Sequence, residues 1–200
     1  MHRGTTSSID NGEILAAHRP RTEVLESTVT IKTASITLAG GDLRFVARSG
    51  SGHTIVLDDG HGDTGMRPSE LIPIAVAGCT AMDVISILRK KRQVVSRYEV
   101  RASGEQQEAH PNAFSRIDIV HVFEGEAINV EAVRRAIELS ATKYCAVGAT
   151  LSSGMTEIHH AYLVRDRDDE ERMSEVIVTG PLEAADAPGT RLAGAAALAA

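Results

Sequence analysis

The stretch from Leu71 to Leu88 places the strongest constraint on the fold. Nearly every residue in it is apolar or small, and Asp83 carries its only charge. A helix of this composition has an apolar surface over most of its circumference, so it must be buried on nearly all sides. Cys79, one of two cysteines in the chain, lies near its middle. We therefore expect a central helix around which the other elements pack.

The same run is borderline in length for a membrane span. It contains Thr80, Asp83 and Ser86, and it stands alone in the chain, which favours the core of a soluble protein. The first twenty residues lack the apolar segment of a secretory signal. We expect a cytoplasmic protein with no membrane partner.

A chain of 200 residues with 42% hydrophobic and 24% charged residues is long enough for one sizeable core. We expect a flexible N-terminal arm over residues 1–25, one domain over 26–165 and a mobile C-terminal tail over 166–200. The net charge of -6 argues against a nucleic-acid or anionic membrane surface, because neither would be attracted by the overall field. A small-molecule substrate fits better.

The first half of the domain is predicted to be a β-meander followed by the central helix. Residues 27–38, 43–47 and 53–57 are rich in β-branched or alternating apolar residues and are separated by glycine-rich turns. The helix starts at Ser69, which can cap it, or at Pro73, which suits the first helical position. Glu70 lies at this entrance, where its charge favours the positive end of the helix dipole.

The second half is predicted to contain two paired strands, a helix and a last strand. Residues 97–103 and 114–123 alternate in polarity and are expected to pair antiparallel. A helix then runs from an Asn129 cap to Tyr144, with Cys145 at its end, and residues 156–164 form the last strand. The fold class is α+β.

The two cysteines are either inert core residues or a redox pair. Two are too few for a disulfide scaffold, and they have no C-x-x-C spacing. A redox pair needs an activated thiolate, and Cys79 lies about 15 Å from the helix start, beyond the reach of the dipole. A cation must therefore come from Arg44 or Arg48 on the early strands, or from a second chain. Glu70 is the candidate carboxylate for such an arginine, or else compensates the helix dipole alone.

The remaining polar residues carry weaker signals. Asp83 would oppose thiolate formation on Cys79, so we expect it to make a structural hydrogen bond to a strand or a capping group. His159 and His160 point to opposite faces of a strand and so do not favour a shared metal. The sequence predicts no metal and no cofactor. Three other histidines are expected at the surface: His53, His61 and His121.

Three motifs follow the three early strands: G-x-x-P-S-E-L around Glu70, A-G-C-T-A-M-D-V around Cys79, and K-Y-C-A-V around Cys145. With these motifs the chain resembles the OsmC/Ohr family of osmotically inducible and organic hydroperoxide resistance proteins, over roughly residues 27–165. The resemblance implies an α+β fold with antiparallel sheets around long central helices, in an intertwined homodimer with its sites at the dimer interface.

The resemblance also implies a chemistry. Cys79 matches the nucleophile that attacks organic hydroperoxides, and Cys145 matches the thiol that resolves the sulfenic acid as a disulfide. A small dithiol or a lipoyl-bearing protein would then reduce the disulfide. Ser69 and Ala146 stand where peroxidases of this family usually carry glutamate and proline. A dimer that binds a small apolar ligand, or serves a structural role under stress, therefore remains the alternative.

Overall fold

The computed structural model describes residues 29–40, 43–165 and 171–181. The predicted N-terminal arm, residues 1–25, lies outside this range. The larger of two compact units begins at Ala34.

The first three strands form a sheet of their own. They are β1 (Ala34–Leu38), β2 (Phe45–Ser49) and β3 (Thr54–Leu57), and they pair antiparallel in chain order. The predicted meander is therefore confirmed, but β1 is shorter than residues 27–38. Ala34 pairs with Ser49, the last residue of β2, so no part of β2 remains to extend the ladder toward residue 29.

The central helix α1 spans Leu71–Lys90 and follows a short 3-10 turn, η1 (Pro68–Glu70). Arg67, rather than the predicted Ser69, occupies the capping position of this turn. Pro73 lies in the first turn of α1, where its missing amide hydrogen would have had no helical partner. Arg89 and Lys90 lie in the last turn and complement the negative end of the dipole.

A second sheet contains β4 (Val95–Gln106), β5 (Phe114–Gly125), β6 (Glu157–Arg165) and β7 (Glu171–Thr179), in that order. The predicted antiparallel pairing of β4 with β5 is confirmed. However, β5 and β6 run parallel, so the sheet is mixed rather than antiparallel. The helical segment between them forms the long crossover that a parallel pair requires.

Strand β7 corrects the expectation of a mobile tail from residue 166. It pairs antiparallel with β6 from Ile158 to Arg165. Its sequence, ERMSEVIVT, alternates charged or polar residues with apolar ones only in part, and the flanking charges hid the strand signal. Residues 166–170 and 182–200 lie outside the described part of the chain.

The crossover is built from α2 (Val130–Leu139), a π-helical turn η2 (Ser140–Tyr144) and α3 (Ala146–Ser152). The predicted Asn129 cap is present, with its side chain accepting the Ala132 amide at 3.0 Å. The regular helix ends five residues before the predicted Tyr144. Cys145 then has an extended backbone (φ -73°, ψ 97°), which lets α3 start in a new direction.

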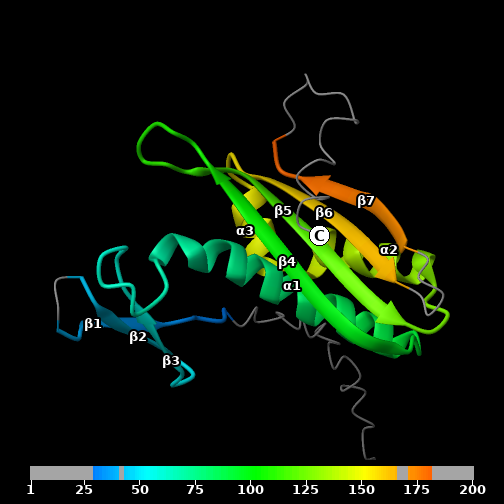
Figure 1. Cartoon of the computed structure of the whole chain (residues 1–200), viewed down its shortest axis with the longest axis horizontal. Helices are drawn as coiled ribbons and strands as arrows, with labels where there is room; N and C mark the ends of the chain where they lie inside the picture. The colour runs from blue at the N-terminus through cyan, green and yellow to red at the C-terminus, as the bar shows by residue number, and fades with distance from the viewer. Residues whose placement is uncertain (1–28, 41–42, 166–170, 182–200) are drawn as a thin grey trace, which may run out of the picture. The chain divides into compact units, whose positions relative to one another are not determined.

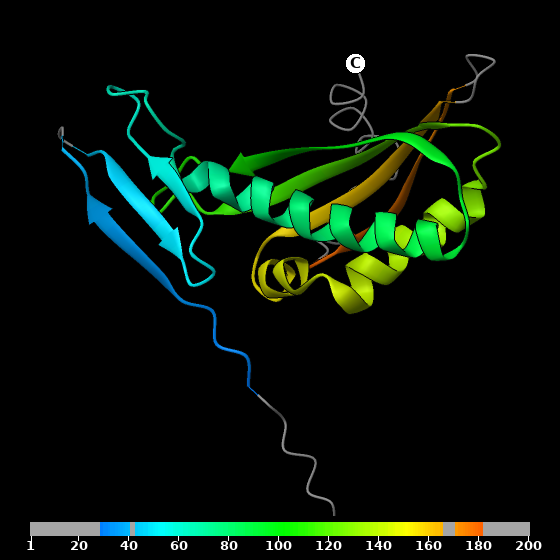
Figure 2. The ribbon, with the colours of Figure 1, turned by 90° about the horizontal axis from the view of Figure 1, so that it is seen from below.

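Figures 1 and 2 show that α1, α2 and α3 lie on one face of the four-stranded sheet. Two apolar clusters fill this layer, one around Phe123 and Ile137 and one around Ile119 and Cys145. Only four residues of α1 are buried in a single chain: Val76, Thr80, Val84 and Leu88.

The other side of α1 carries Ile74, which is 52% exposed, and Met82, which is 74% exposed. The segment Pro68–Lys90 is long and apolar enough to cross a membrane by length and composition alone, a test that core helices of soluble proteins also pass. An exposed apolar helix face of this kind favours contact with a partner.

Candidate functional site

The structure brings the two cysteines together. Cys79 lies half-buried on α1, and Cys145 lies buried at the N-cap of α3. Cys79 packs against the apolar cluster to which Cys145 belongs, together with Val76, Ile117, Ile119 and Ile158. Two thiols from segments 66 positions apart therefore share one apolar environment.

The surroundings of Cys145 hold it in the protonated form. Burial, and next the hydrogen bond with Cys79, raise the pKa of the Cys145 thiol to about 12. The amide of Gly148 donates to Cys145 Sγ at 3.2 Å and acts in the opposite direction. The charges of Cys79 and Asp83 raise the pKa further. Cys145 is thus a thiol in direct contact with Cys79, which suits a resolving rather than an attacking cysteine.

Gly148 lies directly beside this sulfur. A Cβ at residue 148 would lie 3.3 Å from Cys145 Sγ, so a larger residue would crowd the thiol and its amide hydrogen bond. The sequence showed Gly148 only as an interruption of helical periodicity. In the structure Cys145 is the N-cap of α3, and Gly148 lies in the first turn of that helix, where its amide reaches the sulfur.

Polar residues close in sequence to the two cysteines connect α1 to η2 by hydrogen bonds. Ser140 Oγ lies 3.0 Å from Thr80 Oγ1 and 3.0 Å from Asp83 Oδ2. Asp83 therefore makes a structural hydrogen bond, as expected, and its partner Ser140 is both the C-cap residue of α2 and the first residue of the π-helical turn. Sequence reasoning did not single out Thr80 or Ser140, because a lone hydroxyl at helical spacing carries no distinctive signal.

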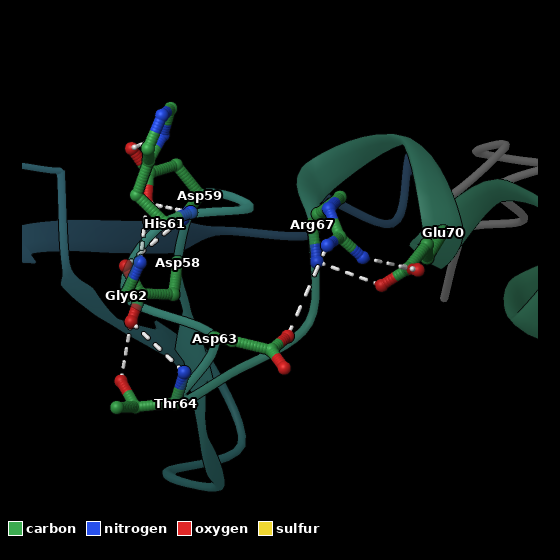
Figure 3. Close-up of polar contacts among 8 residues, drawn as sticks. All are labelled: Asp58, Asp59, His61, Gly62, Asp63, Thr64, Arg67 and Glu70. Atoms are coloured by element: carbon green, nitrogen blue, oxygen red, sulfur yellow. Dashed lines mark hydrogen bonds and ion pairs between the residues drawn. The ribbon is translucent and has the colours of Figure 1, made fainter.

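Glu70 is paired with Arg67 rather than with an arginine from the early strands. Its Oε2 accepts the Arg67 amide at 2.8 Å, and its Oε1 lies 3.2 Å from Arg67 Nη1 (Figure 3). Arg67 also lies 3.8 Å from Asp63. The i, i+3 spacing of Arg67 and Glu70 is the signal that could have identified this pair.

Arg44 and Arg48 have different environments from those expected. Arg44 donates to Thr64 Oγ1 at 3.1 Å and to the Ala39 carbonyl at 3.2 Å. Thr64 in turn donates to Asp58, and this hydrogen bond lowers the pKa of the Asp58 carboxyl (Figure 3). Arg48 lies opposite Ser35 in the small sheet with an exposed side chain. Neither arginine pairs with Glu70, so the predicted Glu70–arginine pair is wrong for this chain by itself.

A pocket of about 390 Å³ lies beside the cysteine-bearing turn, lined by Pro73, Ile74, Ala77, Gly78, Ala81, Val100 and Ala102. The side chains that line it are apolar, which suits the organic part of a small molecule.

The histidines make no metal site in the described part of the chain, where no group of three potential ligands comes together. His53 and His61 are exposed, as expected. His121 is 0% exposed, so its predicted surface position is wrong. Its Nδ1 lies 2.7 Å from the Tyr98 hydroxyl, and that partner makes burial tolerable.

Comparison with known proteins identifies the family. The OsmC-like protein family model matches residues 60–161. Protein YhfA of Escherichia coli K12 is 40% identical over 122 residues, which cover 61% of this chain and 90% of YhfA. A solved structure of a hypothetical protein from Aquifex aeolicus VF5 is 26% identical with a TM-score of 0.62, covering 70% of this chain and 99% of that one.

The likeness of fold extends to more distant proteins. The organic hydroperoxide resistance protein from Elizabethkingia anophelis has a TM-score of 0.50 at 16% identity, covering 70% of this chain and 99% of that one. The family model, the sequence relatives and the fold agree, and the chain belongs to the OsmC-like family.

Proposed function

We propose that the protein is a thiol-dependent peroxidase that reduces organic hydroperoxides through a two-cysteine cycle. The observation that carries this proposal is the contact between Cys79 and Cys145 inside one apolar cluster. Proteins of known fold similarity include organic hydroperoxide resistance proteins, which supports hydroperoxides as the substrate class.

Each step of the cycle follows from thiol chemistry. The Cys79 thiolate attacks the distal oxygen of ROOH, the O–O bond breaks, and the alcohol leaves with a proton. The resulting sulfenic acid condenses with Cys145, and water and a disulfide form. A dithiol then restores both thiols by exchange. Neither a metal nor an organic cofactor is needed in this cycle.

A homodimer would complete the site. The exposed apolar face of α1, with Ile74 and Met82, is the kind of surface that a second copy of the chain covers. The pocket beside Gly78 opens on this helix. A second chain would also be a source of a cation for Cys79, whose thiolate a nearby positive charge would stabilise.

The proposed setting is the cytoplasm. A reducing compartment keeps both cysteines as thiols between catalytic cycles. The reductant of the cycle would be a small dithiol or a lipoyl-bearing protein, because two adjacent thiols on one reductant can reduce the disulfide without a stable mixed intermediate.

Stopped-flow oxidation with cumene hydroperoxide or a lipid hydroperoxide tests the proposal. Both thiols of the parent should be consumed, and Cys79→Ser should abolish the fast reaction. Cys145→Ser should still form a sulfenic acid at Cys79, which a dimedone probe detects by mass. A parent reaction no faster than that of free cysteine would overturn the proposal.

The second candidate is a dimer that binds a small apolar ligand without reducing it. The engagement of Glu70 by Arg67 favours this candidate, since it leaves Glu70 without the predicted arginine from the early strands. Two results together would support it: a slow reaction with hydroperoxides, and saturable binding of an apolar fluorescent probe. Ala77→Phe should abolish this binding, because the larger side chain would fill the pocket.

A further inference from the structure

A hydrogen-bonded bridge of three residues joins the two segments that carry the cysteines. Its members are Thr80, Asp83 and Ser140, and Ser140 Oγ lies 3.0 Å from an oxygen of each of the other two. Thr80 follows Cys79 directly, and Asp83 lies one helical turn after it. These hydrogen bonds connect α1 to η2 close in sequence to the two cysteines, whose side chains form the other contact between the two segments.

Ser140 links the backbone of Cys145 to α1. Its carbonyl accepts the Cys145 amide at 2.9 Å and so closes the π-helical turn. Its side chain is 0% exposed, as is that of Thr80. A buried hydroxyl is costly without a hydrogen-bond partner, so the side chain of Ser140 is strongly held to α1. Ser140 therefore helps to position Cys145, whose sulfur also accepts the Gly148 amide.

Asp83 faces both this interior and solvent. It is half-buried and also lines a pocket of about 380 Å³ on the outside of the helix layer. Access to water and two nearby lysines make a charged carboxylate tolerable at this place. The charged and titratable groups around Asp83 and Cys145 are Cys79 and Lys90 on α1, Lys91 at the C-cap of α1, Tyr98 on β4, and Tyr144 on η2.

The charge of Asp83 acts on the groups that face it. It contributes to the raised pKa of Cys145, after burial and Cys79. It also contributes, after burial, to the raised pKa of Tyr98, whose hydroxyl contacts His121. The elements packed around Cys145 otherwise present the apolar residues Ile117, Ile119 and Ile158.

We propose that Ser140 and Asp83 are positioning residues for the disulfide step between Cys79 and Cys145. The Ser140 hydroxyl holds the turn with Cys145 against the helix turn with Cys79. The Asp83 carboxylate accepts from this hydroxyl at 3.0 Å, and its charge adds to burial and to Cys79 in disfavouring the thiolate of Cys145. In the step itself, the Cys145 S–H proton joins the hydroxyl that leaves the Cys79 sulfenic acid, the S–S bond forms, and water departs.

This inference rests on the proposed function for its oxidant, but the disulfide step can be driven without a hydroperoxide. With dithionitrobenzoate, Cys79 first forms a mixed disulfide and releases one thionitrobenzoate. Cys145 then displaces a second one and forms the Cys79–Cys145 disulfide. The rate of the second release, followed by absorbance over a range of pH, measures the disulfide step separately from the first reaction.

Ser140→Ala should slow the second release about tenfold or more, because small displacements of reacting atoms are costly, and leave the first release unchanged. Asp83→Asn keeps an oxygen acceptor for Ser140 but removes the charge. Its second release should follow a pH profile displaced to lower pH by up to about one unit. Ser86→Ala, an exposed serine on the same helix, is the matched control and should behave as the parent.

A folded Ser140→Ala variant with the parent rate of second release would overturn the positioning role of Ser140. A pH profile of Asp83→Asn that superimposes on that of the parent would overturn the role of the charge, and Asp83→Asn tests the proposal even where Ser140→Ala does not fold. Failure of hydroperoxides to oxidise Cys79 would remove the proposed function alone, since the second release is measured without them.

Discussion

Glu70 closes an ion pair with Arg67, three residues before it, and also accepts the Arg67 amide. The carboxylate thus ties the loop after β3 to the start of α1. Glu70 was expected to orient an arginine from the early strands. It instead makes local contacts with Arg67 at the start of the helix.

The Arg67–Glu70 pair should be measurable as a coupled contribution to stability. Arg67→Ala and Glu70→Gln should each lower the free energy of unfolding by about 1 kcal/mol, because each removes part of a capping interaction. The double variant should lose less than the sum of the two, as interacting residues do. Urea unfolding of the four proteins checks this. Strictly additive losses would mean that the two side chains do not act together.

The two cysteines should differ sharply in reactivity. Burial and the Cys79 contact raise the pKa of Cys145 to about 12, so at pH 8 almost none of it is thiolate. Iodoacetamide at pH 8 should therefore modify Cys79 alone in the folded, reduced protein. Peptide mass spectrometry identifies the modified residue, and the protein in urea is the control in which both cysteines react. Equal labelling of Cys145 in the folded protein would contradict the burial of its thiol.

Local sequence patterns predicted most of the elements around the site. The glycine-rich turns predicted the meander, and the polarity alternation of residues 97–103 and 114–123 predicted their antiparallel pairing. The helix around Cys79 followed from its predominantly apolar composition, in which Asp83 is the only charge. These features depend on residues close together in the chain, and they could therefore be predicted from the sequence.

Features that depend on contacts between residues far apart in the chain could not be predicted from the sequence. The parallel pairing of β5 with β6 depends on the path of a crossover, and β7 depends on the edge that β6 offers. The burial of His121 depends on the Tyr98 hydroxyl from another strand. The hydrogen bonds of Ser140 depend on a π-helical turn, which the spacing of apolar residues in the sequence does not predict. The place of Cys79 within a helix was predicted, whereas Cys145, expected at the end of a helix, is the N-cap of α3, and the groups that hold both cysteines were not predicted.

The buried histidines should make stability fall on acidification. Burial, and next the charge of His159, lower the pKa of His160 to about 4, and burial lowers the pKa of His121 well below its usual value. Both are neutral in the folded protein, whereas the unfolded chain takes up protons near pH 6.5. Their contribution is therefore present above pH 6.5 and is lost as the pH falls toward 4, by roughly 3 kcal/mol for His160.

Urea unfolding between pH 7.5 and pH 4.5 measures this loss. His160→Gln should give a shallower dependence on pH, because one of the two groups that the unfolded chain protonates preferentially is removed. His53→Gln, at an exposed position, is the control and should follow the parent. A His160→Gln variant with the same slope as the parent would show that His160 titrates alike in both states.

Gly180 tests whether β7 is part of the domain. It has φ +108°, and a Cβ there would lie 2.4 Å from the Thr156 carbonyl oxygen, at the start of β6. Gly52 has φ +91° with no atom within 4 Å of such a Cβ. Gly52→Ala should cost about 1 kcal/mol from backbone strain alone, and Gly180→Ala clearly more. Thermal unfolding compares the two, and equal losses would mean that the end of β7 is not packed against β6.

The exposed face of α1 should be the contact between two copies of the chain. Met82 is 74% exposed on this helix, and a glutamate there would place an unpaired charge in an apolar interface. Light scattering of the parent at micromolar concentration should give twice the 21.3 kDa chain mass, and Met82→Glu should shift it toward the single-chain mass. Val94→Glu is the matched control, since Val94 is 70% exposed but lies outside α1. A parent that is monomeric, or a Met82→Glu variant that stays dimeric while Val94→Glu dissociates, would place the contact elsewhere.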